Sequence, residues 1–439
     1  MYGCFMAGYC LVPLNARLTG PELEYHLSDS GAVALVTDEE GAAIFEGRDL
    51  SGAVLLVAGT DGYERLASGA ERLPVANVDR DDPAWLFYTS GTTGRPKGAT
   101  LTHGNLDFVT ASWLADLTPM TEDDVVLHAA PLSHGAGFHA LAAVARGAHQ
   151  VILPAGSFDP VAVLSLIQRA GVTNTWMVPT QIVMLTDAVE KGSCDGHLPT
   201  LDRVVYGGAP CAPAELRRAL EVFGPVFVQL FGQGETPMTA TVLPPSDHAA
   251  ALAGERQERL GSAGYARPGM DVRILGPDGS ELPSGEVGEV CVRGPAVMSG
   301  YWERPDATAE ALRNGWLHTG DLGRMDAFGY LYLLDRAKDM IITGGSNVYA
   351  VEVEAALASH PAVHDAAVVG VPDRTWGELV VAVVVTDAPS TDLEAELAAH
   401  CATELAGYKR PRRWVFVESL PRNAYGKVLK RQLREELSS

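Results

Sequence analysis

Residues 86–103 of this chain read Leu-Phe-Tyr-Thr-Ser-Gly-Thr-Thr-Gly-Arg-Pro-Lys-Gly-Ala-Thr-Leu-Thr-His. The apolar run at residues 84–88 predicts a buried strand, and a turn rich in glycines and hydroxyl side chains follows it. Glycines let backbone N–H groups approach an anion closely, hydroxyls add donors, and a lysine adds positive charge. The stretch therefore predicts a phosphate-binding loop made of Thr89, Ser90, Gly91, Thr92, Thr93, Gly94 and Lys97.

This loop differs from a Walker A loop, because the G-x-x-x-x-G-K-[ST] spacing is absent. A glycine-rich surface loop without any ligand is the alternative interpretation. The strand ahead of the loop and Lys97 behind it favour phosphate binding.

The length and composition indicate a globular protein of more than one domain. At 439 residues the chain is longer than one ordinary hydrophobic core supports, and hydrophobic residues make up 47% of it. A net charge of −22 argues against a nucleic-acid-binding or peripheral membrane protein, since either requires a basic surface. The exception is residues 408–434, where nine Lys or Arg and one acid give +8. This segment is either a solvated basic surface or a contact surface for an anionic ligand.

The cysteines and the apolar runs bear on localisation. None of the six cysteines forms a C-x-x-C pair or a metal-ligand spacing, which is typical of reduced thiols. The N terminus has no basic leader, and no apolar run reaches the length of a membrane span. We therefore expect a cytoplasmic protein without membrane insertion.

Helical and strand-like segments alternate over the first half of the chain. Residues 9–13 and 32–37 read as strands around a helix that begins at residue 19, which predicts one βαβ unit. Further along, the pattern predicts helices at 105–117, 137–146 and 160–170 and strands at 124–129, 150–153, 203–206 and 226–230. Such alternation predicts an α/β domain with a mostly parallel sheet, where ligands gather at the carboxyl ends of the strands. We also expect the start of this domain to be missing.

Two of these strands end in loops that suit a flat ligand. The strand at 203–206 leads into Gly207-Gly208-Ala209-Pro210, and the strand at 226–230 leads into Phe231-Gly232-Gln233-Gly234-Glu235-Thr236. Glycines permit close approach of a ring, Phe231 can stack on one, and Glu235 can bind a divalent cation. A third loop, 131–137, carries His134, which either caps the following helix or has a role in the site.

The pattern changes after residue 260. Short strands at 271–275 and 288–293 with Pro/Gly turns predict a small β subdomain over 261–335. Asp321 follows a glycine at a strand end and suits ribose hydroxyls, although an exposed turn aspartate is the commoner explanation. The polar run at 335–339 predicts a domain boundary, so 1–335 forms the large N-terminal domain and 336–439 a mobile α+β C-terminal domain.

Taken together, these motifs resemble one family. The run 86–97 is similar, position by position, to the AMP-binding signature of the adenylate-forming superfamily, which includes acyl-CoA synthetases, aryl-CoA ligases, luciferases and adenylation domains of peptide synthetases. The other motifs follow in that family's order along essentially the whole chain. Family members usually carry further residues before the segment that corresponds to Met1.

The resemblance implies a set of site residues. The loop from Thr89 to Lys97 would hold the triphosphate, and the remaining nucleotide contacts would come from Gly208, Ala209, Pro210, Phe231, Gly232, Asp321 and Arg336. Glu235 would be the magnesium-associated glutamate, and His134 would lie between the acyl pocket and the entrance for the thiol. In the C-terminal domain the implied residues are the hinge Lys338, the pantetheine-tunnel loop with Gly344 and Gly345, and Lys427, which would serve adenylation.

One position departs from the family pattern. Gly234 stands where the family typically has a threonine ahead of the glutamate, and Thr236 is the nearest replacement hydroxyl. The remaining pocket residues expected by analogy are Gly207, Leu230 and Met238.

The resemblance implies an acyl-CoA or aryl-CoA ligase that uses ATP, Mg²⁺ and CoA on a small carboxylic acid. An adenylating enzyme that passes the acyl group to a carrier protein or an amine is the first alternative. An inactive nucleotide-binding remnant is the second. The joint presence of Lys97, Glu235, Asp321 and Lys427 favours a catalyst.

Overall fold

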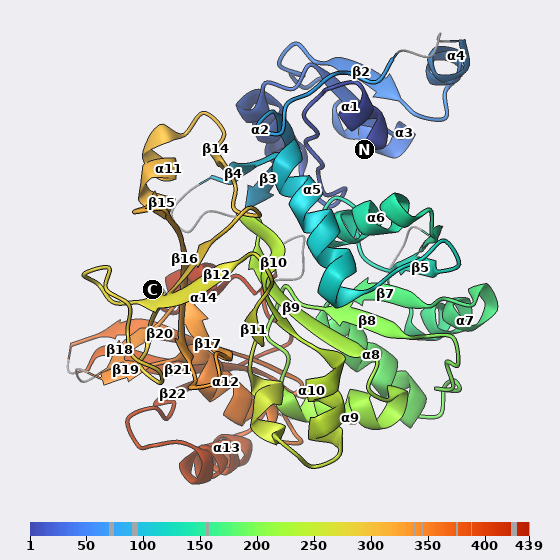
Figure 1. Cartoon of the computed structure of the whole chain (residues 1–439). Coiled ribbons are helices and arrows are strands. Elements are labelled where there is room, and N and C mark those ends of the chain that lie inside the picture. The colour runs from blue at the N-terminus through green and yellow to red at the C-terminus, as the bar shows by residue number, and fades with distance from the viewer. Residues whose placement is uncertain are drawn as a thin grey trace.

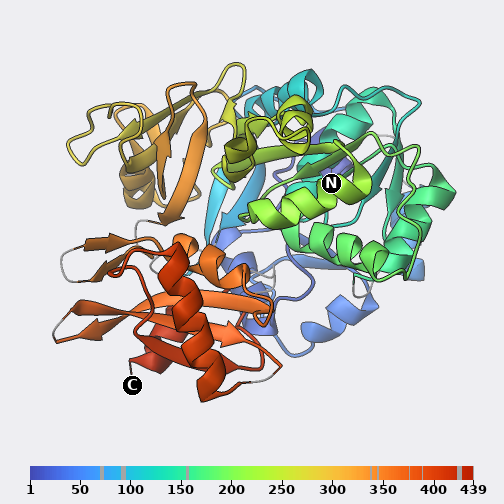
Figure 2. The same ribbon diagram turned by 90° about the horizontal axis from the view of Figure 1, so that it is seen from below.

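The structure is a computed structural model that describes residues 1–69, 74–89, 95–154, 158–336, 339–343, 346–374, 376–387, 389–422 and 428–438. A large N-terminal domain and a smaller C-terminal domain are arranged as separate lobes (Figures 1 and 2). Among the described residues, no helix combines the length and the apolar composition that crossing a membrane requires.

The first segment of the chain is a small α/β layer at one end of the large domain (Figure 1). Its elements are α1 (Tyr2–Met6), α2 (Gly20–Ser30), β1 (Ala34–Thr37), α3 (Glu39–Ile44), β2 (Val54–Val57) and α4 (Asp61–Gly69). The predicted βαβ unit is wrong, because β1 pairs in parallel with β2. Residues 9–13 form only a single bridge, between Leu11 and Trp85. Pro13, which has no N–H group, cannot donate to a continued ladder.

The predicted phosphate-binding loop joins two antiparallel strands. Strand β3 (Pro83–Thr89) pairs with β4 (Lys97–Thr102), and β14 (Gly300–Tyr301) adds to the far side of β4. The prediction of a buried strand ahead of the loop is confirmed, while β4 was not predicted. Residues 90–94, which include Ser90, Gly91, Thr92, Thr93 and Gly94, lie outside the described residues.

The central sheet has seven strands in the order β11-β10-β9-β8-β7-β5-β6. The five from β6 to β9 are parallel, as predicted, and β10 and β11 run antiparallel. The strands are β5 (Val125–His128), β6 (His149–Ile152), β7 (Asn174–Met177), β8 (Arg203–Tyr206), β9 (Phe227–Gln233), β10 (Thr236–Leu243) and β11 (Tyr265–Ala266). The helices of this region are α5 (His103–Ser112), α6 (Gly135–Arg146), α7 (Pro160–Ala170), α8 (Pro179–Glu190), α9 (Pro213–Phe223) and α10 (Pro245–Leu252). Two short helices join them, a π-helical turn η1 (Trp113–Leu117) and a 3₁₀ turn η2 (Gln257–Gly261).

Helix α7 shows why the local sequence sufficed for these elements. Asp159 caps its start by accepting hydrogen bonds from the N–H groups of residues 161 and 162, and Pro160 occupies the first turn. Gly171 ends the helix with a φ of 64°. Val163, Leu164 and Ile167 form its buried face at helical spacing.

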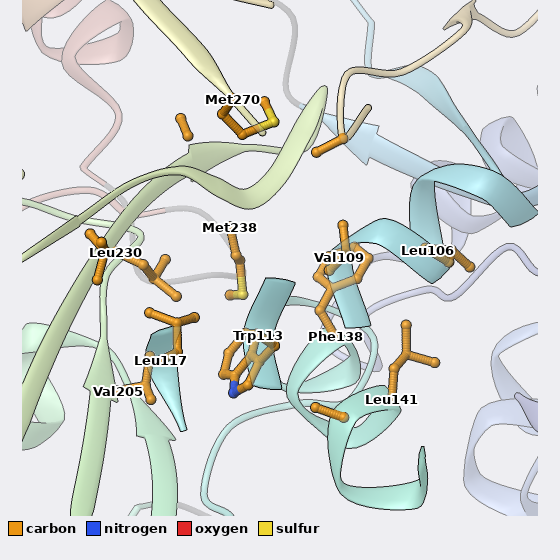
Figure 3. Close-up of a cluster of buried hydrophobic side chains, with 14 of the residues drawn as sticks. Leu106, Val109, Trp113, Leu117, Phe138, Leu141, Val205, Leu230, Met238 and Met270 are labelled. Carbon is orange, nitrogen blue, oxygen red and sulfur yellow. The ribbon is translucent and has the colours of Figure 1, made fainter. Parts of the chain in front are cut away.

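The central sheet carries two buried clusters. One packs helices α7, α8 and α9 on the sheet, and the other lies between the sheet and helices α5 and α6. Figure 3 shows side chains from these helices, from η1 and from strands β8, β9 and β10 that converge there. Trp113 and Val109 are fully buried, and burial of such side chains stabilises the fold by about 1.5–3 kcal/mol each. Residues of the following β-rich region, including Val290 and Leu317, belong to the same core.

The β-rich region forms a five-stranded sheet in the order β12-β13-β16-β15, and the fifth strand, β17, pairs with residues 321–325 of β16. Its elements are β12 (Asp271–Leu275), β13 (Gly288–Arg293), α11 (Pro305–Ala311), β15 (Leu312–Arg313), β16 (Trp316–Met325) and β17 (Leu331–Arg336). The strands predicted at 271–275 and 288–293 are confirmed. The exact limits 261–335 of a subdomain stay a prediction.

The C-terminal domain is an α+β unit around one sheet in the order β19-β18-β21-β20, with β22 parallel to β21. Its elements are β18 (Ile341–Thr343), β19 (Ser346–Val348), α12 (Ala350–Ala358), β20 (Asp365–Asp373), β21 (Gly377–Val385), α13 (Thr391–Glu404), β22 (Arg413–Val417) and α14 (Lys430–Leu437). Apolar side chains are buried in two clusters that hold alternate residues of β20 and β21, such as Val368 in one and Val369 in the other. The large α/β domain and the small C-terminal domain were both predicted, and the mobility of the second stays a prediction.

Candidate functional site

Glu235 lies at the centre of the site, in the tight connection between β9 and β10. Its Oε1 accepts hydrogen bonds from Thr89 Oγ1 at 2.9 Å and from Tyr301 Oη at 2.7 Å. The residue is 8% exposed, and its backbone carbonyl accepts from the N–H of Met298 at 2.8 Å. Segments that are 146 and 66 residues away in sequence therefore meet at one carboxylate.

Lys97, the first residue of β4, brings a positive charge to the same place. Its Nζ lies 5.1 Å from the centroid of the Tyr301 ring, a cation–π contact. The strand start beside it is supported from α2, where Tyr25 Oη donates to the carbonyl of Pro96 at 2.7 Å. Thr89 and Lys97 are thus the two ends of the predicted phosphate-binding loop. Thr89 is hydrogen-bonded to Glu235, and Lys97 lies against Tyr301.

The structure explains why residue 234 is a glycine. A Cβ atom at Gly234 would lie 2.4 Å from Thr89 Cγ2 and 2.5 Å from Phe87 Cδ1, so the space for a threonine side chain is already filled. Thr236 is fully buried, and its Oγ1 has no hydrogen-bond partner in the described part of the chain. The role of Thr236 as a replacement hydroxyl stays a prediction.

Asp321, on β16, lies next to the end of β9. Gln233 Nε2 donates to Asp321 Oδ2 at 2.6 Å and to the carbonyl of Thr319 at 3.0 Å. Arg336 is the register partner of Asp321 on the antiparallel strand β17, so the backbone places the two residues side by side. The strand position excludes the alternative of an exposed turn aspartate.

The segment after β8 lies at the carboxyl end of the parallel strands. A Cβ atom on Gly207 would lie 2.5 Å from the carbonyl oxygen of Leu230, so the glycine is needed where β8 and β9 approach each other. Gly208 has a φ of 79°, and Gly208, Ala209 and Pro210 are exposed. On the neighbouring strand, Phe231 is partly exposed, in register with Thr241. Residues 208–210 are therefore accessible at a strand end, as the sequence predicted, whereas Phe231, which was expected in a loop, lies within β9.

Gly232 sits between the two arms of the β9–β10 hairpin. A Cβ atom there would lie 2.5 Å from the carbonyl oxygen of Thr236 and 2.6 Å from the backbone N of Met238. A side chain would force the hairpin apart at the point where it carries Glu235. The glycine is thus a requirement of this tight turn.

The ring of His134 packs against the ring of Phe87, with a distance of 4.9 Å between the two ring centroids. Burial lowers the pKa of His134 to about 4, so the imidazole is neutral at physiological pH. It occupies the position before α6 but makes no side-chain capping bond to the described residues of that helix. His134 is therefore the capping residue of α6 by its position and backbone, since its carbonyl accepts from the N–H of Gly137 at 2.9 Å, and its role in the site stays a prediction. His134 and Phe87 line a small pocket together with Pro13, Tyr88 and Ser133.

Side chains are tightly packed around Met238, in the region where the acyl pocket is expected. A Cβ atom on Gly135 would lie 2.1 Å from Met238 Cε and 2.8 Å from Trp176 Cζ2, so these two side chains pack directly under the start of α6. Met238 adopts a φ of 57°, rare for a residue with a side chain. Its carbonyl accepts a hydrogen bond from the buried Arg267 Nη1 at 2.8 Å, which holds this conformation. The role of these residues in binding an acid stays a prediction.

Four predicted residues of the C-terminal domain, Lys338, Gly344, Gly345 and Lys427, lie outside the described residues. Five cations of the basic segment around the last of them form ion pairs with acids of their own domain. The ion pairs are Lys409–Glu352, Arg422–Asp365, Lys430–Glu354, Arg431–Glu435 and Arg434–Asp339. Charge alone is therefore a weak argument for an anion-binding surface here.

Two residues that the sequence did not single out complete the site. Tyr301 hydrogen-bonds to Glu235 and lies against Lys97, and Gln233 orients Asp321. Gln233 is the last residue of β9, two positions before Glu235. This closeness to a predicted site residue was the only signal in the sequence that it could belong to the site. Tyr301 follows a glycine in an uncharged stretch, and nothing local distinguishes it from an ordinary aromatic residue.

Both domains of this chain are similar to known protein families. The sequence model of the AMP-binding enzyme family matches residues 1–302, and that of the AMP-binding enzyme C-terminal domain matches residues 352–427. The chain is 42% identical over 436 residues to a feruloyl-CoA synthase of an Amycolatopsis species, covering 99% of this chain and 85% of that protein. It is 37% identical over 440 residues to the fatty acid–[acyl-carrier-protein] ligase ScoC of Streptomyces coeruleorubidus, covering 99% of this chain and 83% of that protein.

Among solved structures, the ATP-bound MatB of Rhodopseudomonas palustris is similar with a TM-score of 0.88 and 34% identity. The alignment covers 99% of this chain and 85% of that one. The similarity spans both domains.

Proposed function

Because this chain belongs to the AMP-binding, adenylate-forming enzymes, in their acyl-CoA ligase branch, we propose that it is an ATP-dependent carboxylate–CoA ligase. In the first half-reaction the carboxylate attacks the α-phosphorus of ATP, which gives an acyl adenylate and pyrophosphate. In the second, the thiol of CoA attacks the acyl carbon and AMP leaves. ATP is needed because joining a carboxylate to a thiol is unfavourable in water, and the mixed anhydride carries a good leaving group.

The observation that carries this proposal is the meeting of Thr89, Lys97, Glu235 and Tyr301 at one point. An anion must attack an anionic phosphorus, so the site has to spread negative charge in an environment that excludes water. The loop between Thr89 and Lys97 would hold the phosphates with backbone amides and hydroxyls, and Lys97 would add a cation.

A magnesium ion fits this arrangement. Glu235 offers a carboxylate oxygen, the ligand type that Mg²⁺ prefers, and the two hydroxyl donors hold that carboxylate in one orientation. Glu235 would hold the ion together with the phosphates, and the ion would supply neutralisation of the phosphate charge.

The remaining nucleotide contacts would come from β16, from the end of β9 and from the segment after β8. Asp321 would accept hydrogen bonds from the ribose hydroxyls while Gln233 keeps its carboxylate in place. The accessible segment from Gly208 to Pro210 and the ring of Phe231 would flank the adenine. His134, neutral and beside Phe87, would lie where the acid and the thiol meet.

The C-terminal domain would act in both half-reactions. Lys427 would neutralise charge during adenylation and then has to withdraw so that the thiol can enter. Rotation about Lys338 would remove Lys427 and present the loop with Gly344 and Gly345 to the pantetheine arm.

Transfer to a carrier protein or an amine is the second candidate, favoured by the 37% identity to a ligase that acts on an acyl-carrier-protein. Assaying one activated acid against CoA, a carrier protein and amines separates the two. Success with a carrier or an amine and failure with CoA would replace the leading proposal.

The experiment that tests the proposal is acid-dependent ATP–pyrophosphate exchange on the purified chain. The panel spans hydroxycinnamic, benzoic and fatty acids of increasing length. Lys427→Ala is expected to abolish exchange while thioester formation from supplied acyl adenylate continues. The matched control is Arg431→Ala, which removes a positive charge from the same segment at an exposed ion pair.

The outcomes decide between the hypotheses. Exchange with some acids supports adenylation and names the substrate class. No exchange with any acid from a folded protein would favour the inactive remnant. Equal loss of both half-reactions in Lys427→Ala would contradict the role given to that lysine.

A further inference from the structure

A group of three different donor side chains lies on the sheet of the β-rich region, apart from the residues of the proposed nucleotide site. Glu289 and Cys291 are on β13 and His318 is on β16, where Cys291 and His318 are register partners. One ligand atom from each residue, the carboxylate oxygen, the thiol sulfur and a ring nitrogen, lies within 4.8 Å of the other two. Cys291 is fully buried, whereas the side chains of His318 and Glu289 are 12% and 27% exposed.

The three side chains converge on a single ring nitrogen. His318 Nδ1 lies 2.7 Å from Glu289 Oε2 and 3.4 Å from Cys291 Sγ. This nitrogen carries one proton or one lone pair, which points well toward only one partner. The shorter contact goes to the carboxylate, and the sulfur is left with a weak interaction.

We propose that Glu289, Cys291 and His318 form a zinc-binding site, with solvent water as the fourth ligand. Nitrogen, thiolate sulfur and carboxylate oxygen are the donors that Zn²⁺ takes in proteins, with bonds of about 2.0, 2.3 and 2.0 Å. The partial exposure of His318 and Glu289 leaves one side open to water.

Two of the three distances between ligand atoms can be compared with those that tetrahedral zinc requires, and the third, between the sulfur and the oxygen, is at most 4.8 Å. With these bond lengths, the nitrogen and sulfur ligands lie about 3.5 Å apart and the nitrogen and oxygen ligands about 3.3 Å apart. The nitrogen–sulfur distance of 3.4 Å already fits. The nitrogen–oxygen distance of 2.7 Å has to widen by about half an ångström, which the partly exposed Glu289 side chain can supply.

The charges and protons of the site balance. Burial, followed by the charge of Glu289, raises the pKa of the Cys291 thiol to about 12, so the metal-free protein carries a thiol there. Zinc binding replaces the thiol proton, which leaves to solvent. The proton that His318 Nδ1 donates to Glu289 has to leave that nitrogen as well, and it moves through solvent to Nε2 so that Nδ1 can bind the metal. Zn²⁺ with one thiolate and one carboxylate has no net charge, which suits a half-buried position.

The surroundings both orient the site and compete with the metal. Glu289 Oε1 accepts a hydrogen bond from the N–H of Gly320 at 3.1 Å, an interaction that fixes the carboxylate from behind. Arg313 Nη2 lies 3.6 Å from Glu289 Oε2, but its side chain is 50% exposed and can turn toward solvent. Gly320 precedes Asp321, so a bound ion would brace the part of β16 that carries the proposed ribose-binding carboxylate.

The test uses cobalt as a spectroscopic substitute for zinc on the full-length, metal-free chain. Tetrahedral Co²⁺ bound to a thiolate gives visible ligand-field bands and a sulfur-to-metal charge-transfer band, which a magnesium-type oxygen site does not give. We expect one equivalent of Co²⁺ to produce both, and Zn²⁺ to abolish them by displacement. Competition against a chelating dye then gives the zinc affinity.

Three variants make the result specific. Cys291→Ser is expected to remove the charge-transfer band and to weaken zinc binding at least about 100-fold. Cys401→Ser, at an equally buried cysteine of α13 in the other domain, is the matched control and should bind as the native chain does. Glu289→Gln is the second test of the site, in case Cys291→Ser fails to fold, because it changes a partly exposed side chain. It should weaken zinc binding at least about tenfold.

Cobalt binding without a charge-transfer band, or an unchanged spectrum in Cys291→Ser, would overturn the proposal. So would an unchanged zinc affinity in Glu289→Gln. None of these measurements depends on ligase activity, so they stand or fall independently of the proposed function.

Discussion

The buried histidines make the stability of this protein depend on pH, and His139 provides the sharpest case. It lies on α6, is fully buried, and donates from Nε2 to Asn174 Oδ1 at 2.9 Å. The ring stacks on Trp113 at 5.1 Å and meets His128 edge-on at 5.6 Å. Burial, and after it the neighbouring His128, lower the pKa of His139 to about 3.

The direction of the effect follows from proton binding. An unfolded histidine has a pKa of about 6.5, so below that pH the unfolded chain binds a proton at this residue, whereas folded His139 stays unprotonated down to a pH of about 3. The free energy of unfolding therefore falls as the pH drops from about 6.5 toward 3, and above 6.5 the residue has no such effect. At pH 5 the difference of about 1.5 pH units corresponds to about 2 kcal/mol from this one side chain.

The variant His139→Gln tests this reasoning. The glutamine amide keeps a donor for Asn174 but has no charge to gain. We expect the variant to be less stable than the native chain at pH 7.5, because the ring packing against Trp113 is lost. Between pH 7.5 and pH 5, however, its free energy of unfolding should fall by about 2 kcal/mol less than that of the native chain.

Urea unfolding followed by tryptophan fluorescence at the two pH values measures these quantities. The matched control is His149→Gln, at the exposed first residue of β6, which should leave the pH dependence unchanged. Equal loss of stability in the native chain and in His139→Gln would refute the reasoning. His248, whose pKa burial lowers to about 4, adds a similar dependence that is common to all three proteins.

Three further predictions concern the proposed site. Tyr301→Phe removes the hydroxyl that is hydrogen-bonded to Glu235 but keeps the ring beside Lys97. The rate of ATP–pyrophosphate exchange should therefore fall about 10- to 100-fold with little change in the unfolding midpoint, and an unchanged rate would exclude a positioning role. Gly234→Thr places a Cβ 2.4 Å from Thr89 Cγ2 and should cost about 1–3 kcal/mol in urea unfolding, part of which Thr89→Ser should restore. If Thr89→Ser restores nothing, the steric explanation fails. Lys338→Pro should leave exchange intact and slow thioester formation from supplied acyl adenylate, because the ring fixes φ at the proposed hinge, and full activity in both steps would argue against rotation there.

The sequence by itself determined those elements whose signals are local. Helix α7 has its capping Asp159, its proline and its terminal glycine within a dozen residues, and its ends were predicted correctly. The alternation of short apolar strands and amphipathic helices likewise sufficed for the parallel part of the central sheet. The same holds for the order of the motifs that identified the family.

Tertiary structure decided the partners that these local signals cannot name. Strand β4 is a run of glycine, threonine and small apolar residues that reads as loop, and it becomes a strand because β3 and β14 pair with its two edges. The β9–β10 hairpin, bent tightly at Glu235, was read as a strand followed by a loop for the same reason.

The site itself was predicted as separate pieces and assembled only by the fold. Glu235, Lys97 and Asp321 were recognised as candidates, but Tyr301 and Gln233 became visible only through contacts with residues 66 and 88 positions away. A side chain that positions another residue has no charge pattern or spacing of its own. Its role exists only in the distance between two atoms, and that distance is fixed by packing of the whole domain.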